Sequence, residues 1–247
     1  MSSELGVHRI HLAETDSTNR YAREHTTDGA FTLITTDHQT AGRGQRGTVW
    51  ESAPGENLLF SLAFKPTHIP SSQQFVLCEL ISVALCEVLS TYTDEIRIKW
   101  PNDIYHRDRK LCGILIEHDL EGTRLSRTVI GVGLNVNQRH FASDAPNPVS
   151  LLHVLGHEVE REALLSAIVS RFVELYRGYA TSLLSRDGLH RRYTALLYRK
   201  DVAASYADSQ GAFTATLRDV APDGRLLLED RQGTLRSYLF KEVAYVI

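Results

Sequence analysis

A short segment rich in glycine and arginine constrains this chain most. It runs from Gln39 to Trp50, reads QTAGRGQRGTVW, and holds three glycines, two arginines and a tryptophan in its last nine residues. It has little side chain to bury, which predicts an irregular loop instead of a helix or strand. Its amides and arginines can bind an anion, and Trp50 offers a flat face for a ring. A loop that closes over a phosphate-bearing ligand is favoured over a surface linker, because linkers favour Ser, Pro and Glu.

Size and charge limit the class of protein. The 247 residues suffice for one large domain or for a medium domain with a small appendix. The net charge of −3 and the lack of a basic N-terminal arm disfavour a nucleic-acid partner. The most apolar segment, 75–89, contains two glutamates, which predicts a buried helix and no membrane partner. Three cysteines without a CxxC pair, and a start unlike a signal peptide, predict a cytoplasmic protein.

Hydrophobic periodicity and turn residues divide the chain into two parts. After residue 198, five short β-type segments separated by turn pairs suggest a small β-barrel. We therefore predict two domains, 1–197 and 198–247. In the first domain, the patterns predict strands at 7–14, 31–36, 57–64, 96–100, 111–118 and 128–136, and helices at 17–25, 71–92, 162–184 and 188–197.

A second informative run, KWPND, occupies residues 99–103. Lys99 ends a predicted strand, because Pro101 has no N–H to give to a sheet. Asn102 and Asp103 then lie at a strand end, and Lys110 opens the next strand. The pattern brings a carboxylate, an amide and two ammonium groups close together, as a charged ligand would require. A surface hairpin with ordinary salt bridges is an equal alternative.

Two further runs are weaker on their own. Gly131 and Gly133 leave two bare positions on one face of a strand, where a flat ligand could lie, although close packing is the favoured interpretation. The polar residues Ser17, Thr18 and Asn19 precede a helix and could bind a polar ligand, although capping of the helix is the more common use.

Taken together, these runs resemble the biotin protein ligases. The matching motifs are DSTN at 16–19, QTAGRGQRGTVW at 39–50, KWPND at 99–103, RKLCGILIE at 109–117 and GVGLN at 131–135. The resemblance implies an α+β catalytic domain similar to class II aminoacyl-tRNA synthetases, followed by a small SH3-like β-barrel. The early position of DSTN implies a monofunctional ligase without a DNA-binding domain.

The resemblance also implies a reaction with biotin, ATP and Mg²⁺. The carboxylate of biotin attacks the α-phosphate of ATP to give biotinyl-5′-AMP and pyrophosphate, and a lysine of a biotin carboxyl carrier protein then attacks the adenylate. No side-chain motif for a metal is present, so Mg²⁺ is expected to bind through the phosphates. Many members dimerise through the catalytic sheet, which makes a homodimer an expectation here.

Residue roles follow from the same resemblance. Asp103 is the candidate to orient or deprotonate the acceptor lysine, because a protonated amine is a poor nucleophile. Arg43 and Lys110 are expected near the carboxylate and the transferring phosphate, with Lys99 nearer the phosphates or the incoming amine. The biotin contacts are expected at Ser17, Thr18, Gln39, Gly42, Arg43, Lys110, Gly113 and Gly131, and the ATP contacts at Arg46, Trp50, Asn102 and Asn135.

Two positions depart from the family pattern. Gln45 stands where many members have Arg, and Thr48 stands where Arg or Asn is frequent. Loss of this charge predicts a weaker hold on the adenylate. A lipoate- or octanoate-transferring ligase is an alternative that the Gly-Arg loop and KWPND disfavour. A binder that stores biotin or its adenylate is a second alternative, which the presence of Arg43, Lys110 and Asp103 disfavours.

Overall fold

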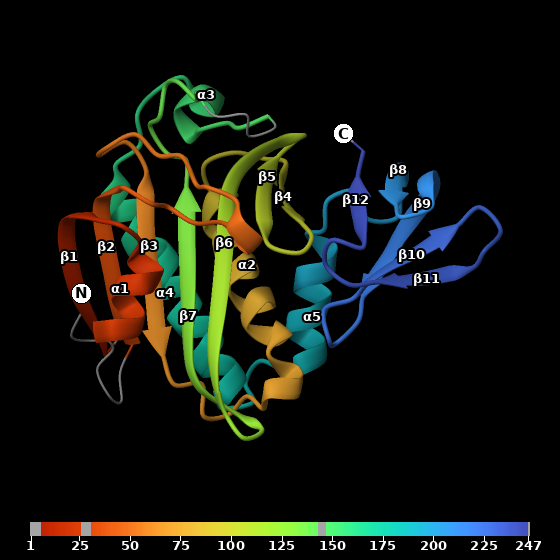
Figure 1. Ribbon diagram of the computed structural model, residues 1–247, viewed down its shortest axis with the longest axis horizontal. Coiled ribbons are helices and arrows are strands. Elements are labelled where there is room, and N and C mark those ends of the chain that lie inside the picture. The colour runs from red at the N-terminus through yellow and green to blue at the C-terminus, as the bar shows by residue number, and fades with distance from the viewer. Residues whose placement is uncertain (1–5, 26–30, 143–146, 247) are drawn as a thin grey trace.

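The computed structural model describes residues 6–25, 31–142 and 147–246. Its larger sheet has seven strands in the order β1-β2-β3-β7-β6-β5-β4 (Figure 1). Strands β1 and β2 are parallel, and every other neighbouring pair in this sheet is antiparallel. The strands are β1 Val7–Thr15, β2 Phe31–Gln39, β3 Leu58–Phe64, β4 Ile96–Lys99, β5 Asp103–His106, β6 Arg109–Glu121 and β7 Arg124–Leu134.

Helices cover both faces of this sheet. Helix α1 (Thr18–His25) packs on β2, β3 and β7, whereas α2 (Phe75–Leu89) and α4 (Arg161–Ala180) lie behind the sheet (Figure 1). Helix α5 (Arg186–Ala195) packs against α2, and the short α3 (Leu151–Leu155) lies at one end of the sheet. The main core fills the layer between the sheet and α2 and α4, and it continues into the C-terminal strands through residues such as Leu217, Leu226 and Leu228.

The central helix α2 is apolar on nearly every side, which is typical of a helix enclosed by other elements. Together with the preceding turn it forms one segment, Ser71–Leu89, that is long and apolar enough to cross a membrane, but 72% of that segment is buried inside the fold. This burial confirms the predicted core helix. The helix itself begins at Phe75, because a 3-10 turn, Ser71–Gln73, precedes it.

A second sheet of five strands follows, in the order β11-β10-β9-β8-β12. The five predicted strands are present, as β8 Ala203–Asp208, β9 Gly211–Val220, β10 Leu226–Asp230, β11 Leu235–Tyr238 and β12 Val243–Tyr245. Within residues 203–245 the pairings run in one open row, and none joins the edge strands β11 and β12. A closed barrel, as the sequence predicted, is therefore not seen in these pairings.

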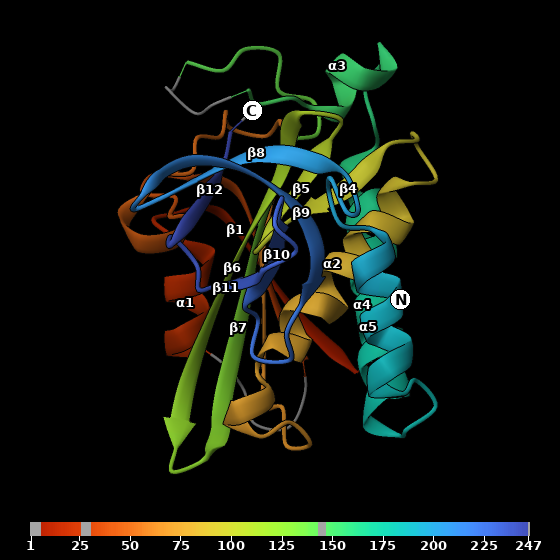
Figure 2. The same ribbon diagram turned by 90° about the vertical axis from the view of Figure 1, so that its right-hand side faces the viewer.

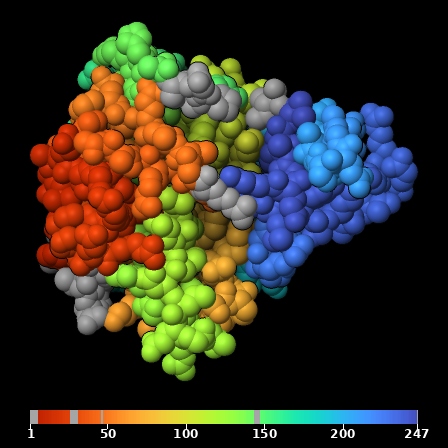
Figure 3. Space-filling view, in the orientation of Figure 1, coloured from red at the N-terminus to blue at the C-terminus, as the bar shows by residue number. Residues whose placement is uncertain are grey.

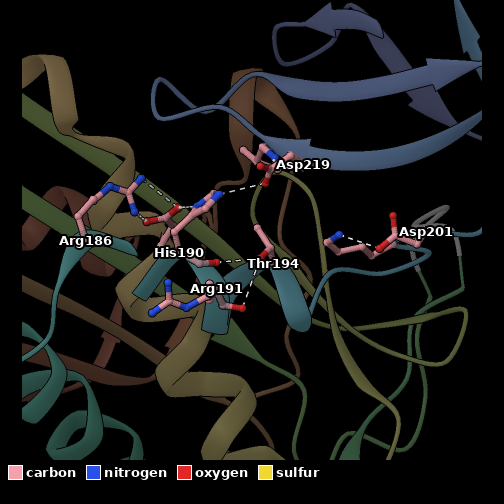
Figure 4. A network of polar contacts seen from close by, with 9 residues as sticks. Arg186, His190, Arg191, Thr194, Asp201 and Asp219 are labelled. Atoms are coloured by element: carbon pink, nitrogen blue, oxygen red, sulfur yellow. Dashed lines mark hydrogen bonds and ion pairs between the residues drawn. The ribbon is translucent and has the colours of Figure 1, made fainter. Parts of the chain in front are cut away.

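The second sheet is fixed against the first part of the chain by polar contacts. His190 of α5 lies between the fully buried carboxylate of Glu79 (2.8 Å) and that of Asp219 (3.0 Å), so it connects α2 with β9 (Figure 4). The indole N–H of Trp100 donates to the carbonyl oxygen of Gly224 (2.8 Å). Figure 3 shows the resulting shape, in which the C-terminal strands form a lobe beside the larger body.

Some elements differ from their predictions. The sequence predicted neither β5 nor α3, because each is only four or five residues long. Strands β6 and β7 are longer than expected and form a hairpin that extends beyond the body (Figure 2). Polar and charged residues occupy the outer part of this hairpin, so its apolar pattern ends before the strands do.

Candidate active site

A pocket of about 780 Å³ lies on the face of β6 and β7, between the Gly-Arg loop and β12. Pockets that bind small molecules typically measure about 300–1,000 Å³. The five sequence motifs meet here although they are far apart in the chain. The predicted residues that line the pocket are Ser17, Thr18, Gln39, Arg43, Trp50, Lys99, Asn102, Asp103, Lys110, Gly113, Gly131 and Asn135.

Two predicted residues do not line the pocket. Gly42 lies beneath the loop, where its carbonyl oxygen accepts a hydrogen bond from the N–H of Trp50 (3.0 Å). A Cβ at Gly42 would come within 2.6 Å of the Trp50 carbonyl oxygen, so only glycine fits there. The backbone of Arg46 belongs to a 3-10 turn, Gln45–Gly47, and its side chain lies outside the described part of the structure.

One end of the pocket is a network of neutral polar side chains. The backbone N–H and the hydroxyl of Thr18 both donate to the side-chain oxygen of Gln39, at 2.8 and 3.1 Å. Ser61 lies 2.8 Å from the Thr18 hydroxyl and 2.6 Å from the side-chain oxygen of Asn19. Because Thr18, Asn19 and Ser61 are buried, their orientations are fixed. This end suits an uncharged polar group with its own donors and acceptors.

The glycines of β6 and β7 lie directly against side chains of other elements. A Cβ on Gly133 or Gly113 would come within 2.4 or 2.8 Å of the Trp50 ring, and one on Gly131 would come within 2.1 Å of Asn19. Trp50 therefore lies directly on β6 and β7, and the glycines are required by that approach. This confirms close packing as the reason for the glycine pattern.

The opposite end of the pocket is charged. The Lys110 ammonium lies 2.7 Å from a carboxylate oxygen of Asp103 and 5.7 Å from the centroid of the Trp50 ring. Residues 103–110 do form a hairpin, but Asp103 and Lys110 both face the pocket and not open solvent. Burial lowers the pKa of Lys99, and the nearby Asp103 opposes that shift. The predicted meeting of a carboxylate, an amide and two ammonium groups is thus confirmed.

Arg43 lies near Glu117, a residue that was not singled out from the sequence. Its guanidinium is 3.8 Å from Glu117 at the end of the RKLCGILIE run. Glu117 also accepts a hydrogen bond from the side-chain amide of Asn19 (2.8 Å). Glu117 is the last residue of the RKLCGILIE motif, so its place in that motif was the available signal.

The Gly-Arg loop is more ordered than its composition predicted. Gln45–Gly47 form one 3-10 turn, and the hydroxyl of Thr48 donates to the carbonyl oxygen of Gln45 (3.0 Å). Arg43 and Val49 form an antiparallel bridge across this turn. The prediction of a loop without helix or strand was therefore wrong for these residues, because a glycine with positive φ at Gly47 lets the turn close.

Two asparagines present groups to the pocket from fixed positions. The amide of Asn102 donates to the carbonyl oxygen of Ile114, and that of Asn135 donates to the carbonyl oxygen of Val149 (3.1 Å). The side-chain oxygen of Asn135 is buried and has no hydrogen-bond partner within the described ranges. A buried acceptor of this kind is available to a donor on a ligand.

The last strand and the loop before it close one side of the pocket. Phe240, Lys241, Val243, Ala244 and Tyr245 all line it. These residues could not be found from the sequence, since no motif connects them with the runs that lie more than a hundred residues earlier. Among the described residues, no group of three His, Cys, Asp or Glu side chains is placed to hold a metal ion. Cys112 is buried next to the pocket, and burial raises the pKa of its thiol, which fits a packing residue.

Known proteins are similar to this chain in sequence and in fold. A model of the biotin/lipoate A/B protein ligase family matches residues 12–135, which is half of the chain. The chain is 31% identical to the bifunctional ligase/repressor BirA of Bacillus spizizenii over 242 residues, covering 95% of this chain and 73% of that protein. The chain belongs to the biotin/lipoate A/B protein ligase family.

Other members of the family are similar over parts or all of the chain. The biotin–[acetyl-CoA-carboxylase] ligase of Mycobacterium tuberculosis is 29% identical over 165 residues, 64% of this chain and 60% of that protein. The fold resembles that of the biotin protein ligase from Aquifex aeolicus in complex with biotin and ATP, with a TM-score of 0.80 and 24% identity over 96% of this chain and 97% of that one.

Proposed function

We propose that this chain is an ATP-dependent biotin–protein ligase. It would activate biotin as biotinyl-5′-AMP and transfer the biotin to a lysine of a biotin carboxyl carrier protein. The observation that carries this proposal is the polarity of the pocket, which has fixed neutral hydrogen-bonding groups at one end and ammonium groups with a carboxylate at the other. The names of the relatives, several of them biotin ligases, support biotin over lipoate.

In the first half-reaction, the pocket has to bring a carboxylate and a triphosphate together although both are anionic. Arg43, Lys99 and Lys110 supply positive charge along the pocket, which lowers that repulsion. Ser17, Thr18 and Gln39 would contact the ureido ring of biotin, and a ligand without matching groups would leave them unpaired. Gly113 and Gly131 make room for the side chains of Trp50 and Asn19 beside this ligand, and Gly42 supports the loop from outside the pocket lining.

The nucleotide would lie toward Trp50. Its ring is held flat on β6 and β7, so an adenine can stack without ordering a mobile side chain. The free side-chain oxygen of Asn135 can accept from an amino or hydroxyl group, and Asn102 and Arg46 would provide further contacts. The Gly-Arg loop covers this region and would keep water away from the adenylate.

In the second half-reaction, the acceptor amine has to lose a proton before it attacks the adenylate. Asp103 is the pocket carboxylate next to Lys110 and Lys99. It would accept that proton or orient the amine. AMP then leaves, with the new amide bond formed between biotin and the acceptor lysine.

We propose Mg²⁺ as the metal of the first step. Mg²⁺ prefers oxygen ligands and binds chiefly through substrate phosphates with one or two protein groups. The carboxylate of Asp103 and the side-chain oxygen of Asn102 fit this donor set, since both line the pocket at its charged end. When bound, the ion would neutralise charge on the phosphates.

The remaining predictions on organisation stay proposals. We infer a catalytic domain, 1–197, similar to class II aminoacyl-tRNA synthetases, and a C-terminal domain, 198–247, of the SH3-like barrel type, which the strongly bent five-stranded sheet supports (Figure 2). A cytoplasmic location is supported by three free, buried cysteines. A homodimer through the catalytic sheet would use its uncovered edge strand, β1.

Mass spectrometry tests the proposed function. A biotin carrier domain is incubated with the protein, biotin and Mg-ATP, and its mass is measured with and without ATP. A gain of one biotin that requires ATP is the expected result. No gain, with biotin still bound in a titration, would contradict the ligase and leave a binder. A gain only with lipoate or octanoate would reassign the substrate.

A further inference from the structure

The C-terminal sheet contributes a side chain to the charged end of the pocket. Lys99 is the last residue of β4, and its ammonium lies between two aromatic rings. The centroid of the Tyr105 ring, on β5, is 5.1 Å from the Lys99 nitrogen, and that of the Tyr245 ring, on β12, is 5.0 Å away. Cations within about 6 Å of a ring centroid are attracted to the ring face.

These rings are fixed by their neighbours. Tyr198 lies 5.7 Å from Tyr105 and 5.9 Å from Tyr245, measured between ring centroids, so it joins the two rings on either side of Lys99. Tyr245 also packs on Tyr206 of β8, at 5.1 Å. The backbone N–H of Tyr198 donates to the carbonyl oxygen of Ile98 (2.8 Å), which ties this cluster to β4. The two rings beside the ammonium group are therefore part of a larger aromatic cluster.

We propose that Tyr245 is a positioning residue that, with Tyr105, holds the ammonium of Lys99 at the phosphate end of the pocket. This inference rests on the proposed ligase function. Burial of Lys99 alone disfavours its charged form. The ring faces of Tyr105 and Tyr245 and the carboxylate of Asp103 favour the charged form. These two tyrosines, here called the clamp, therefore keep a cation where the triphosphate has to bind. The C-terminal sheet thereby becomes part of the catalytic apparatus.

The position of the clamp predicts which substrate is affected. Thr18 and Gln39 lie on α1 and β2, and four strands of the sheet separate β2 from β4. Loss of the Tyr245 ring is therefore expected to impair the use of ATP and to leave the binding of biotin intact. A general loosening of the fold would impair both.

The test compares five variants, among them Lys99→Met and its combination with Tyr245→Leu, in biotin-dependent adenylate formation. Tyr245→Leu should lower kcat/KM for ATP roughly three- to thirty-fold, which is the range that the attraction of a cation to one ring face implies. Tyr245→Phe keeps the ring and should restore most of that loss. The control, Phe213→Leu, removes a ring that packs on Tyr206 and Tyr238 in the same sheet but does not line the pocket.

The fourth comparison places Tyr245→Leu in a Lys99→Met background. If the Tyr245 ring acts through Lys99, adding Tyr245→Leu to the Lys99→Met variant should change kcat/KM for ATP by less than two-fold. The same fold-loss in both backgrounds, or a Tyr245→Phe variant as impaired as Tyr245→Leu, would overturn the proposal. A raised dissociation constant for biotin in Tyr245→Leu would overturn it as well.

A second measurement, the NMR chemical shift of the lysine ε-methylene groups, does not depend on turnover. The chain has five lysines, so the ε-methylene resonances are few, and the Lys99→Met variant assigns the signal of Lys99. Ring currents from two tyrosines should shift this signal upfield, and Tyr245→Leu should reduce the shift. An unshifted signal in the unaltered protein would overturn the clamp. Lack of turnover in the unaltered protein would overturn the proposed function instead, and the resonance would then decide on the clamp alone.

Discussion

Lys110 shows how a single residue of the pocket is positioned. Its ammonium is held by the carboxylate of Asp103 and faces the Trp50 ring. Removal of one group that stabilises developing charge typically lowers a rate by about 10²–10³-fold. We expect Lys110→Met to slow adenylate formation by that factor in single-turnover experiments. Lys200→Met is the control, because Lys200 pairs with Asp201 away from the pocket, and equal rates for the two variants would contradict the role of Lys110.

Lys99 gives a prediction for pH. Burial lowers the pKa of its ammonium below the ordinary value. The charged form is therefore complete at low pH and is lost, as the pH rises, before the value of about 10.4 for a free lysine is reached. We expect adenylate formation to decline on the alkaline side, and Lys99→Arg to lack this decline, because guanidinium stays charged. The same alkaline decline in both proteins would assign it to another group.

Gln45 lines the pocket from the Gly-Arg loop, at the position where the resemblance to the biotin protein ligases leads us to expect arginine. A neutral amide donates hydrogen bonds but does not neutralise the phosphate of the adenylate. We expect the unaltered protein to release more free biotinyl-AMP than a Gln45→Arg variant. The quantity to measure is adenylate in the filtrate after a single turnover without acceptor, and equal release from the two proteins would refute the prediction.

At the scale of elements, strand β7 and the Gly-Arg loop depend on each other through Gly133. A Cβ there would come within 2.4 Å of Trp50, so the ring or the strand has to move. We expect Gly133→Ala to raise KM for ATP and to cost about 1–3 kcal/mol in the free energy of unfolding, as overpacking does. Gly178→Ala is the control, because its Cβ would meet Leu184 at an ordinary 3.6 Å. An unchanged KM in Gly133→Ala would mean that the Trp50 ring does not serve ATP.

The elements also show what could be predicted from the sequence. Long periodic segments such as α2 and α4 were predicted in type and place, since their apolar patterns persist over several turns. The short strand β5 was missed, because its four residues carry no alternation. The turn at Gln45–Gly47 was missed because its stability comes from one hydroxyl contact and one positive φ, which composition does not reveal.

For the whole molecule, the sequence predicted that the motifs meet, but not that the C-terminal sheet closes one side of the pocket that they form. Trp50, Asp103 and Gly131 were expected at one site because the resemblance assigns their motifs to one reaction, whereas the contact of Trp50 with Gly113 and Gly133 was not predicted. The approach of Tyr245 and Phe240 could not be predicted, because it depends on how the second sheet docks. That docking is carried by contacts such as Trp100 with Gly224, which have no local signature.

Glu79 tests how firmly this docking is held. Its carboxylate is fully buried and pairs with Arg186 and His190, and His190 also contacts Asp219 of the second sheet (Figure 4). Removal of one partner from a fully buried pair costs about 3–5 kcal/mol, and the partial exposure of Arg186 and His190 lowers this figure. We expect Glu79→Ala to lose about 2 kcal/mol in chemical denaturation. Glu174→Ala, which breaks a surface pair with Arg171, should lose less than about 1 kcal/mol; equal losses would contradict the prediction.

The central claim is that this pocket joins biotin to ATP, and exchange of labelled pyrophosphate into ATP measures that step without any acceptor protein. We predict exchange that requires biotin, is not supported by lipoate or octanoate, and falls by about 10²–10³-fold in Lys110→Met. Exchange that is independent of biotin, or that lipoate alone supports, would contradict the account.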